Sequence, residues 1–457
     1  MPEIVLSLLV LVSAGYAIAK SYDAKLVLFA AGIVLMLGAA ALSHPILDAK
    51  ISTGNIWLDP LKQIQLGFVK QFSRAGIIIM VLFGFSAYMS NIGANDTAVH
   101  VLSKPIARIR SPYILVPIVF WIGTLLSVII PSAASLAVIL MATLYPILRA
   151  AKMTPLSAAG VIATTATIVP TPLGGDNVVA ARLLGFENVV DYVVMHHAVI
   201  SLPVLVIIGI VHYFWQKYMD RRPDALNLAS VTVDESKMKV RQDLPPAYYS
   251  LFPVIPLILI IIFGLFFRNI KIGLVEITLF SFTLAFITEV IRKGDMKTRM
   301  KDATLFFKGM GDGFSQVVVL IVAAGTLVAG LHAIGIIDMI AGTAKDVSNA
   351  GISLMFIFSA LTAIITFISG SGNAVFYSFI ELIPSIANKA HVDPIMVALP
   401  MQFTSNLIRA ISPVSAVVII VSSVINVSPV EVVKRTSIPL LAGFIATIII
   451  TLFRYAF

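Results

Sequence analysis

Long uninterrupted apolar runs constrain the fold of this chain more than any other feature. Residues 250–267 hold 18 residues without a charged side chain, close to the ~20 that cross a ~30 Å hydrocarbon core as a helix. The alternating pattern of an outer-membrane barrel is absent. The sequence therefore predicts an all-α polytopic membrane protein with about 10 full transmembrane helices. Apolar spans are expected roughly at 3–19, 25–43, 75–92, 112–148, 154–180, 188–214, 248–267, 272–291, 313–334, 352–388, 394–426 and 437–456.

The composition supports a lipid environment. Hydrophobic residues make up 59% of the chain and charged residues 12%, which leaves too little polar surface to cover a soluble globule. The absence of cysteine excludes disulfides, thiolate metal sites and cysteine nucleophiles. The net charge of +9 is interpreted as membrane topology rather than nucleic-acid binding, because the basic residues fall in loops between apolar runs.

An internal repeat is indicated at an offset of roughly 240 residues. The segment IGAND at 92–96 falls on IGIID at 334–338, and PSAAS at 131–135 falls near SGSGN at 369–373. The charged stretch 215–247 separates the two halves. We therefore expect three parts: a first repeat at 1–214, a cytoplasmic linker at 215–247 and a second repeat at 248–457.

The distribution of Lys and Arg predicts how the two repeats are oriented. If 112–150 and 352–390 are re-entrant hairpins and the N-terminus is outside, most basic residues fall in cytoplasmic loops, including the group from Arg292 to Lys308. Both termini are then outside and the repeats have inverted topology. Broken helices are expected at about 154–186 and 394–426, where Pro, Gly and Ser interrupt apolar sequence.

The hairpin turns and helix breaks are the expected functional site. Backbone at membrane depth is left without helical partners only where it lines a cavity or meets a ligand. Exposed N–H groups, helix N-termini, hydroxyls and amides at such places suit an anion. For any single hydroxyl the alternative is a contact between helices. The candidate substrate-binding residues are Ser132, Ser135, Thr171, Ser371, Gly372, Asn373, Ser405, Asn406, Arg409 and Ser412.

Arg409 is the most specific of these candidates. It lies in an otherwise neutral stretch, and its guanidinium can bind a carboxylate with two parallel hydrogen bonds. The alternatives are a structural ion pair with Asp176 or an interfacial position. Asp176, with Asn177, is the candidate for a coupling ion or for charge balance, and Glu381 is a weaker candidate for the same role.

The sequence lacks the motifs of the enzyme classes that a membrane protein of this kind could belong to. It contains no His-Glu-x-x-His motif, no cysteine and no Gly-x-Ser-x-Gly elbow, so we expect a transporter and no enzyme. A channel would need a continuous polar pore, whereas the polar residues here gather in one central zone. No cofactor is expected beyond a coupling Na⁺ or H⁺, and a candidate Na⁺ position is near Ser371, Asn373 and Ser135.

Eight segments give the chain a resemblance to a known family. They are IGAND (92–96), SKP with SPY (103–105, 111–113), LMATLYP (140–146), GDNVVAA (175–181), HYFWQKYMD (212–220), SGSGNAVFYSF (369–379), SNLIRAISPVSAVV (405–418) and SPVEVVKRTSIP (428–439). On these segments the chain resembles the anaerobic four-carbon dicarboxylate uptake carriers of the C type, within the ion-transporter superfamily.

The resemblance implies exchange or efflux of succinate, fumarate or malate across a bacterial inner membrane, with both termini periplasmic. It further implies a homodimer in which a still scaffold holds a transport domain that moves with both hairpins, an elevator mechanism. The expected partners are a small dicarboxylate and the lipid bilayer, with no nucleic acid. The alternative is a cation-coupled transporter of another small organic anion, a monocarboxylate or an amino acid.

Overall fold

The computed structural model describes residues 2–456 except Ser21, Ala107, Arg108, Arg110, Pro131, 223–242, Arg268, Lys271, Asp338 and 340–349. Three features named above fall outside the described residues: Pro131 of the first turn, Asp338 of the repeat, and most of the expected linker. The described part is helical and contains no strand. Nine of its helices are long and apolar enough to cross a membrane. The prediction of an all-α polytopic membrane protein is confirmed.

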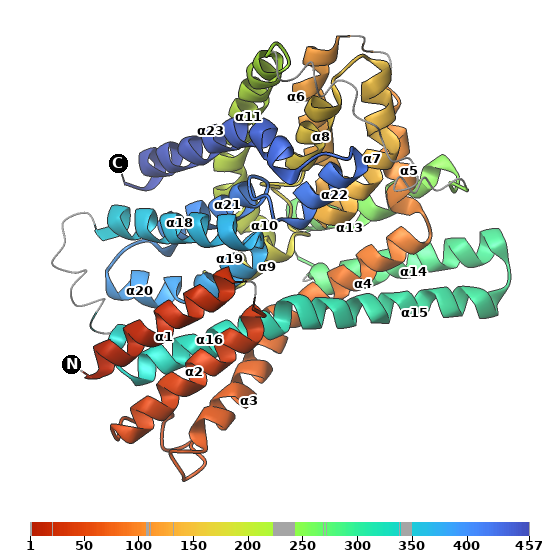
Figure 1. Ribbon diagram of the computed structural model, residues 1–457. Coiled ribbons are helices and arrows are strands. Elements are labelled where there is room, and N and C mark those ends of the chain that lie inside the picture. The colour runs from red at the N-terminus through yellow and green to blue at the C-terminus, as the bar shows by residue number, and fades with distance from the viewer. Residues whose placement is uncertain are drawn as a thin grey trace.

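The first half of the chain forms a series of long helices followed by shorter ones (Figure 1). Its elements are α1 (Pro2–Ala19), α2 (Ala24–Ala41), α3 (Asp59–Gln71), the π-helical turn η1 (Phe72–Gly76), α4 (Ile77–Asn91), α5 (Ala94–Ser103), α6 (Pro112–Ile129), α7 (Ala133–Ala150), α8 (Pro155–Thr164), α9 (Gly175–Leu183), α10 (Val189–Tyr192), the π-helical turn η3 (Val193–His197) and α11 (Ala198–Met219).

The second half has a similar order of elements. They are η5 (Ala247–Val254), α13 (Ile255–Phe266), α14 (Leu274–Lys293), α15 (Met296–Gly313), the π-helical turn η6 (Phe314–Val318), α16 (Val319–Ala333), α18 (Ala350–Ser369), α19 (Gly372–Ile380), α20 (Ile383–Lys389), α21 (Pro394–Arg409), α22 (Ala416–Val424) and α23 (Pro429–Tyr455).

Three helices begin with the same local signal, a capping side chain followed by proline. Thr154, Asp393 and Ser428 each accept a hydrogen bond from a backbone N–H in the first turn of α8, α21 and α23. Proline is favoured directly after such a cap, because its fixed φ suits the first turn and its missing N–H would have no partner there. The sequence thus sets the start of both helices that precede a break.

Two of the long helices extend well beyond the spans expected from apolar runs. The expected spans at 75–92 and 313–334 are the C-terminal parts of α3–α4 and α15–α16, which run on through η1 and η6. The prediction that Arg292 to Lys308 form a loop is wrong, because α15 begins at Met296. A search for unbroken apolar runs misses α3 and α15 because both carry many polar residues.

The long helices form one bundle, named here the long-helix bundle and made of α2, α3–α4, α14 and α15–α16. Figure 1 shows α4 beside α15 and α2 beside α16. Glycines allow both contacts: a Cβ at Gly84 would lie 2.5 Å from the carbonyl oxygen of Phe306, and one at Gly32 would lie 2.5 Å from that of Thr326. The two helix pairs meet where η1 contacts η6.

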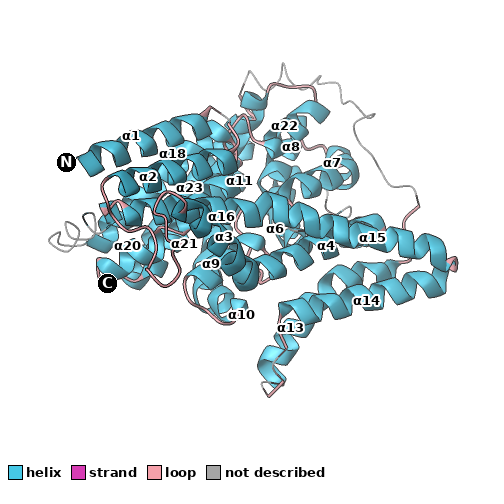
Figure 2. Cartoon of the chain, turned by 90° about the horizontal axis from the view of Figure 1, so that it is seen from below, coloured by secondary structure: helices cyan, strands magenta, loops and turns pink. Residues whose placement is uncertain are grey.

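A second bundle, named here the hairpin bundle, is made of α6–α9, α11 and α18–α23. The turn after α6 and the turn after α18 fall inside the expected hairpins, and the gaps between α8 and α9 and between α21 and α22 fall inside the expected broken helices. Figures 1 and 2 both show the two chain termini at the same end of the molecule.

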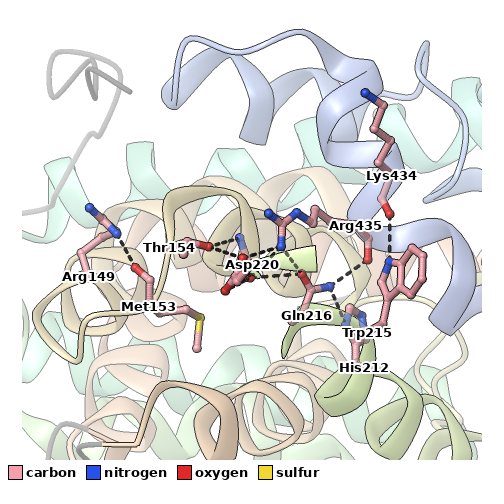
Figure 3. Close-up of polar contacts among 10 residues, drawn as sticks. Arg149, Met153, Thr154, His212, Trp215, Gln216, Asp220, Lys434 and Arg435 are labelled. Atoms are coloured by element: carbon pink, nitrogen blue, oxygen red, sulfur yellow. Dashed lines mark hydrogen bonds and ion pairs between the residues drawn. The ribbon is translucent and has the colours of Figure 1, made fainter. Parts of the chain in front are cut away.

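A buried ion pair holds the centre of the hairpin bundle together. Arg435 of α23 lies 2.5 Å from the carboxylate of Asp220, and their side chains are only 2% and 4% exposed. Ser157 and Gln216 complete the network around the guanidinium (Figure 3). Asp220 directly follows α11, so the first residues of the expected linker at 215–247 continue this helix.

Candidate functional site

The hairpin turns and the helix breaks meet at one cavity of about 680 Å³ between the two bundles. Nine of the residues predicted from the sequence line it: Ser132, Ser135, Thr171, Asp176, Ser371, Gly372, Asn373, Asn406 and Arg409. Asn177, Ser405 and Ser412 do not line it. The hydroxyls of Ser405 and Ser412 donate to the carbonyl oxygens of Gln402 and Phe367, both at 2.7 Å.

Four helices of the hairpin bundle begin at this cavity. Their first residues, Ala133 of α7, Gly175 of α9, Gly372 of α19 and Ala416 of α22, all line it. The first N–H groups of a helix have no partner within the helix, and the helix dipole places partial positive charge at this end. The cavity is therefore suited to a carboxylate or another small anion.

The second hairpin is fixed by two close backbone approaches. Gly370 has φ +72°, and a Cβ at this position would lie 2.8 Å from the backbone nitrogen of Ser415. A Cβ at Gly372 would lie 2.1 Å from the carbonyl oxygen of Ser405. Only glycine fits at such distances, so the turn is held directly against the broken helix α21–α22.

Asp176 is held by side-chain amides from the other broken helix. Its Oδ2 accepts hydrogen bonds from Gln402 at 3.0 Å and from Asn406 at 2.9 Å. Gln402 also donates to Asn177 Oδ1 at 2.7 Å, and Tyr192 donates to Gln402 Oε1 at 2.6 Å. The sequence reasoning missed Gln402. The sequence signal that could have found Gln402 is its position one helical turn before Asn406, directly after an apolar stretch of the same helix.

The guanidinium of Arg409 contacts the backbone of the break between α8 and α9. One terminal nitrogen donates to the carbonyl oxygen of Ala166 at 2.7 Å, whereas its buried Nε has no hydrogen-bond partner. The alternative ion pair with Asp176 is not formed among the described contacts, although both residues line the cavity. The guanidinium thus keeps donor capacity for a ligand, as a bidentate carboxylate contact requires.

The first hairpin presents hydroxyls rather than amides. Ser135 donates to the hydroxyl of Ser132 at 3.0 Å, and the same oxygen caps α7. Thr171, in the break between α8 and α9, also has a hydroxyl at the cavity, and its Oγ1 accepts a hydrogen bond from the backbone N–H of Leu173 at 3.2 Å. The lone pairs and protons that remain on Ser132 and Ser135 are free for an anion or for a hard cation that binds oxygen.

The long-helix bundle supplies the opposite wall of the cavity. Asp312 and Gln316 lie on it, together with Lys25, which pairs with Asp23 at 3.3 Å. Glu381 lies outside this cavity, in a second one of about 360 Å³. In the described part of the chain, no group of three or more His, Asp or Glu side chains is arranged to hold a metal ion.

Comparisons with solved structures place the fold among transporters. The Alcanivorax borkumensis YdaH transporter matches 94% of this chain and 98% of its own, with a TM-score of 0.62 and 13% identity. Neisseria gonorrhoeae MtrF, described as illuminating a class of antimetabolite efflux pumps, matches 95% and 96% with a TM-score of 0.56 and 14% identity. At these identities the likeness concerns the fold.

Comparisons of sequence go further. The family described as "C4-dicarboxylate anaerobic carrier", DcuC, matches residues 1–456. A Vibrio cholerae protein named "Probable anaerobic C4-dicarboxylate transporter DcuC" is 37% identical over 99% of this chain and 98% of its own length. The Escherichia coli K12 anaerobic C4-dicarboxylate transporter DcuC is 34% identical over 98% and 96%. The chain therefore belongs to the DcuC family of anaerobic C4-dicarboxylate carriers, and it is a multi-pass membrane transporter and not an enzyme.

Proposed function

We propose that this protein exchanges or exports C4-dicarboxylates such as succinate, fumarate and malate across the bacterial inner membrane. The observation that carries the proposal is the convergence of four helix N-termini and Arg409 on one cavity. One substrate carboxylate meets Arg409, and the other meets the N–H groups that begin the hairpin and broken helices. Family membership supports the choice of dicarboxylates over other anions.

We further propose an elevator mechanism, in which the hairpin bundle carries the site past the long-helix bundle. Its support is that the cavity wall is shared between these two bundles. The π-helical turns begin at Phe72 and Phe314, 242 positions apart, and Gly93 and Gly335, at the same offset, both have positive φ. These matched features support two inverted repeats at 1–214 and 248–457 around the linker.

The orientation and assembly of the protein are part of the proposal. Both termini lie at the same end of the molecule (Figure 1), and the positive-inside rule puts that end in the periplasm. We propose a homodimer, with the long-helix bundle at rest. Translocation of net charge costs ~2.3 kcal/mol per elementary charge per 100 mV. A counter-transported dianion, Na⁺ near Ser135, Ser371 and Asn373, or H⁺ would offset that cost.

The test is uptake of radiolabelled succinate by proteoliposomes that are empty or preloaded with unlabelled fumarate, with and without a sodium gradient. Uptake that needs preloading and is lost in Arg409→Ala is the expected result. Uptake that is blocked by a monocarboxylate or an amino acid but not by fumarate would favour another small organic anion. No uptake by folded protein under any condition would overturn the assignment.

A further inference from the structure

The second cavity is related to the first by the internal repeat. The residues of the long-helix bundle that line the first cavity include Gly309, Asp312 and Gln316. The positions 242 residues earlier are Gly67, Lys70 and Arg74, and these line the second cavity. The same offset converts four more wall residues of the first cavity, Phe83, Ser86, Ala87 and Ser90, into Gly325, Val328, Ala329 and His332 of the second.

The two equivalent walls differ in charge. The wall that now faces the substrate site carries Asp312 and Gln316, whereas the equivalent positions of the second wall carry Lys70 and Arg74. The side chains of Lys70 and Arg74 make no hydrogen bond and no ion pair with any residue that the structure describes. The second wall therefore carries two cations, beside Glu381 of the hairpin bundle, at the positions where the first carries a carboxylate and an amide.

A carboxylate from the hairpin bundle currently covers this second wall. Glu381 follows α19 and lines the cavity together with Lys70 and Arg74. It accepts a hydrogen bond from Gln71 Nε2 at 2.6 Å, and Ser385 of the same hairpin lies 2.8 Å from His332 Nε2. If the hairpin bundle moves along the long-helix bundle, the Gln71–Glu381 and Ser385–His332 contacts break, and the Glu381 carboxylate leaves the second cavity.

We infer that the surface of Lys70, Arg74 and His332 is the wall that the substrate site faces in the opposite end state, with Lys70 and Arg74 as further contacts for the transported anion. The inference rests on the proposed alternating access. In an inverted repeat, the two end states use equivalent surfaces of the resting part. Glu381 occupies in this state the place that a substrate carboxylate takes in the other.

The affinity of the carrier for its anion then differs between the two sides of the membrane. On one side the site faces Asp312, Gln316 and the neutral Lys25–Asp23 pair, and on the other it faces two cations. A charge-assisted contact is stronger than a neutral one, so the carrier binds its dianion more tightly in the state that faces the basic wall. Arg74 and Lys70 thus set affinity on one side only.

Cysteine cross-linking tests the geometry, since the chain has no cysteine of its own. One variant carries Ala374→Cys with Ala87→Cys, which line the same cavity in this state. The other carries Ala374→Cys with Ala329→Cys, where Ala329 is the equivalent of Ala87 on the second wall. Because a working carrier visits both end states, a short bismaleimide is expected to bridge both pairs irreversibly during turnover. Bridging of the first pair but never of the second, in a variant that still transports, would overturn the inference.

Side-resolved kinetics test the role in binding. Arg74→Gln, which copies the equivalent Gln316, is expected to raise the half-saturating succinate concentration about tenfold on one face of oriented proteoliposomes. The control is Lys62→Gln on the same helix, which lines neither cavity. Equal effects of Arg74→Gln on both faces, or on neither, would contradict the inference. If the native protein carries no dicarboxylate, the cross-linking result still stands as a separate test of the two walls.

Discussion

The side-chain amide of Gln402 lies 3.0 Å from Asp176 Oδ2, although the two residues are 226 positions apart in the sequence. The same nitrogen reaches Asn177, and Tyr192 donates to the amide oxygen. Gln402 therefore joins the two broken helices behind the cavity and orients the carboxylate of Asp176. Two of its three polar partners, Asn177 and Tyr192, are buried, so the loss of this contact would leave buried polar atoms unpaired.

Gln402→Leu is expected to lower both stability and transport. The substitution removes the hydrogen-bond partner of Asn177 Oδ1 and of the Tyr192 hydroxyl, and each orphaned buried group costs about 1–3 kcal/mol. We expect a lower thermal unfolding midpoint in detergent and slower uptake by proteoliposomes. Gln65→Leu is the matched control, because Gln65 is exposed and such substitutions usually stay within about 0.5 kcal/mol. Equal midpoints for the two variants would contradict the assigned role of Gln402.

Arg435 and its neighbour Lys434 provide a comparison between a buried and an exposed ion pair. Removal of one partner from a buried pair costs about 3–5 kcal/mol, because the other charge is left unpaired. Exposed pairs contribute about 0–1 kcal/mol, and the Lys434–Glu431 pair is 54% and 27% exposed. Arg435→Met should therefore lower the unfolding midpoint strongly and Lys434→Met hardly at all.

The double variant Arg435→Met with Asp220→Leu sharpens this comparison. It removes both charges from the interior, so part of the lost stability should return relative to Arg435→Met alone. A double variant that is less stable than either single variant would show that Asp220 has a further partner of equal importance. The measurement is the same thermal unfolding in detergent.

The sequence was sufficient to predict where helices stop, because interruptions of apolar sequence are local signals. Segments with Pro, Gly and Ser inside apolar runs, such as 369–373, have few structures open to them at membrane depth. Most of the residues proposed from these segments line the cavity. Of the three exceptions, Ser405 and Ser412 donate to nearby carbonyl oxygens, as hydroxyls in helical proteins often do, and Asn177 donates to those of Val169 and Thr171.

Other features could not be predicted, because their signals are not local. Gln402 is a neutral amide in a helix that also carries Asn406, and its importance depends on partners more than 200 positions away. The polar helices α3 and α15 lack an apolar run, so hydropathy misses them. The burial of Asp220 is set by Arg435, which no pattern around residue 220 indicates.

Gly372→Ala is expected to abolish transport. The added Cβ would lie 2.1 Å from the carbonyl oxygen of Ser405, a distance that requires the hairpin turn to move away from α21. The matched control is Gly311→Ala, where a Cβ meets nothing within 4 Å and the helix gains about 0.8–1 kcal/mol in intrinsic propensity. Wild-type uptake by Gly372→Ala would show that the turn tolerates displacement from α21.

Asp176→Asn tests whether charge balance depends on this carboxylate, under the proposed elevator mechanism. An asparagine oxygen can still accept from Gln402 and Asn406, so we expect the variant to fold with a similar unfolding midpoint. If Asp176 travels with the substrate, its neutralisation changes the charge moved in each translocation step by one. A potential of 100 mV acts on one charge with ~2.3 kcal/mol, so the voltage dependence of succinate exchange should change measurably.

Asp312→Asn is the matched control for that experiment. Asp312 lines the same cavity but belongs to the long-helix bundle, which stays at rest in the proposed mechanism. Its neutralisation should change affinity on one side while leaving the charge moved in each translocation step the same. The measurement is exchange in proteoliposomes held at defined potassium diffusion potentials. Identical voltage dependence of Asp176→Asn and the native protein would show that the charge of Asp176 does not cross the membrane, and the elevator assignment of the hairpin bundle would then have to be revised.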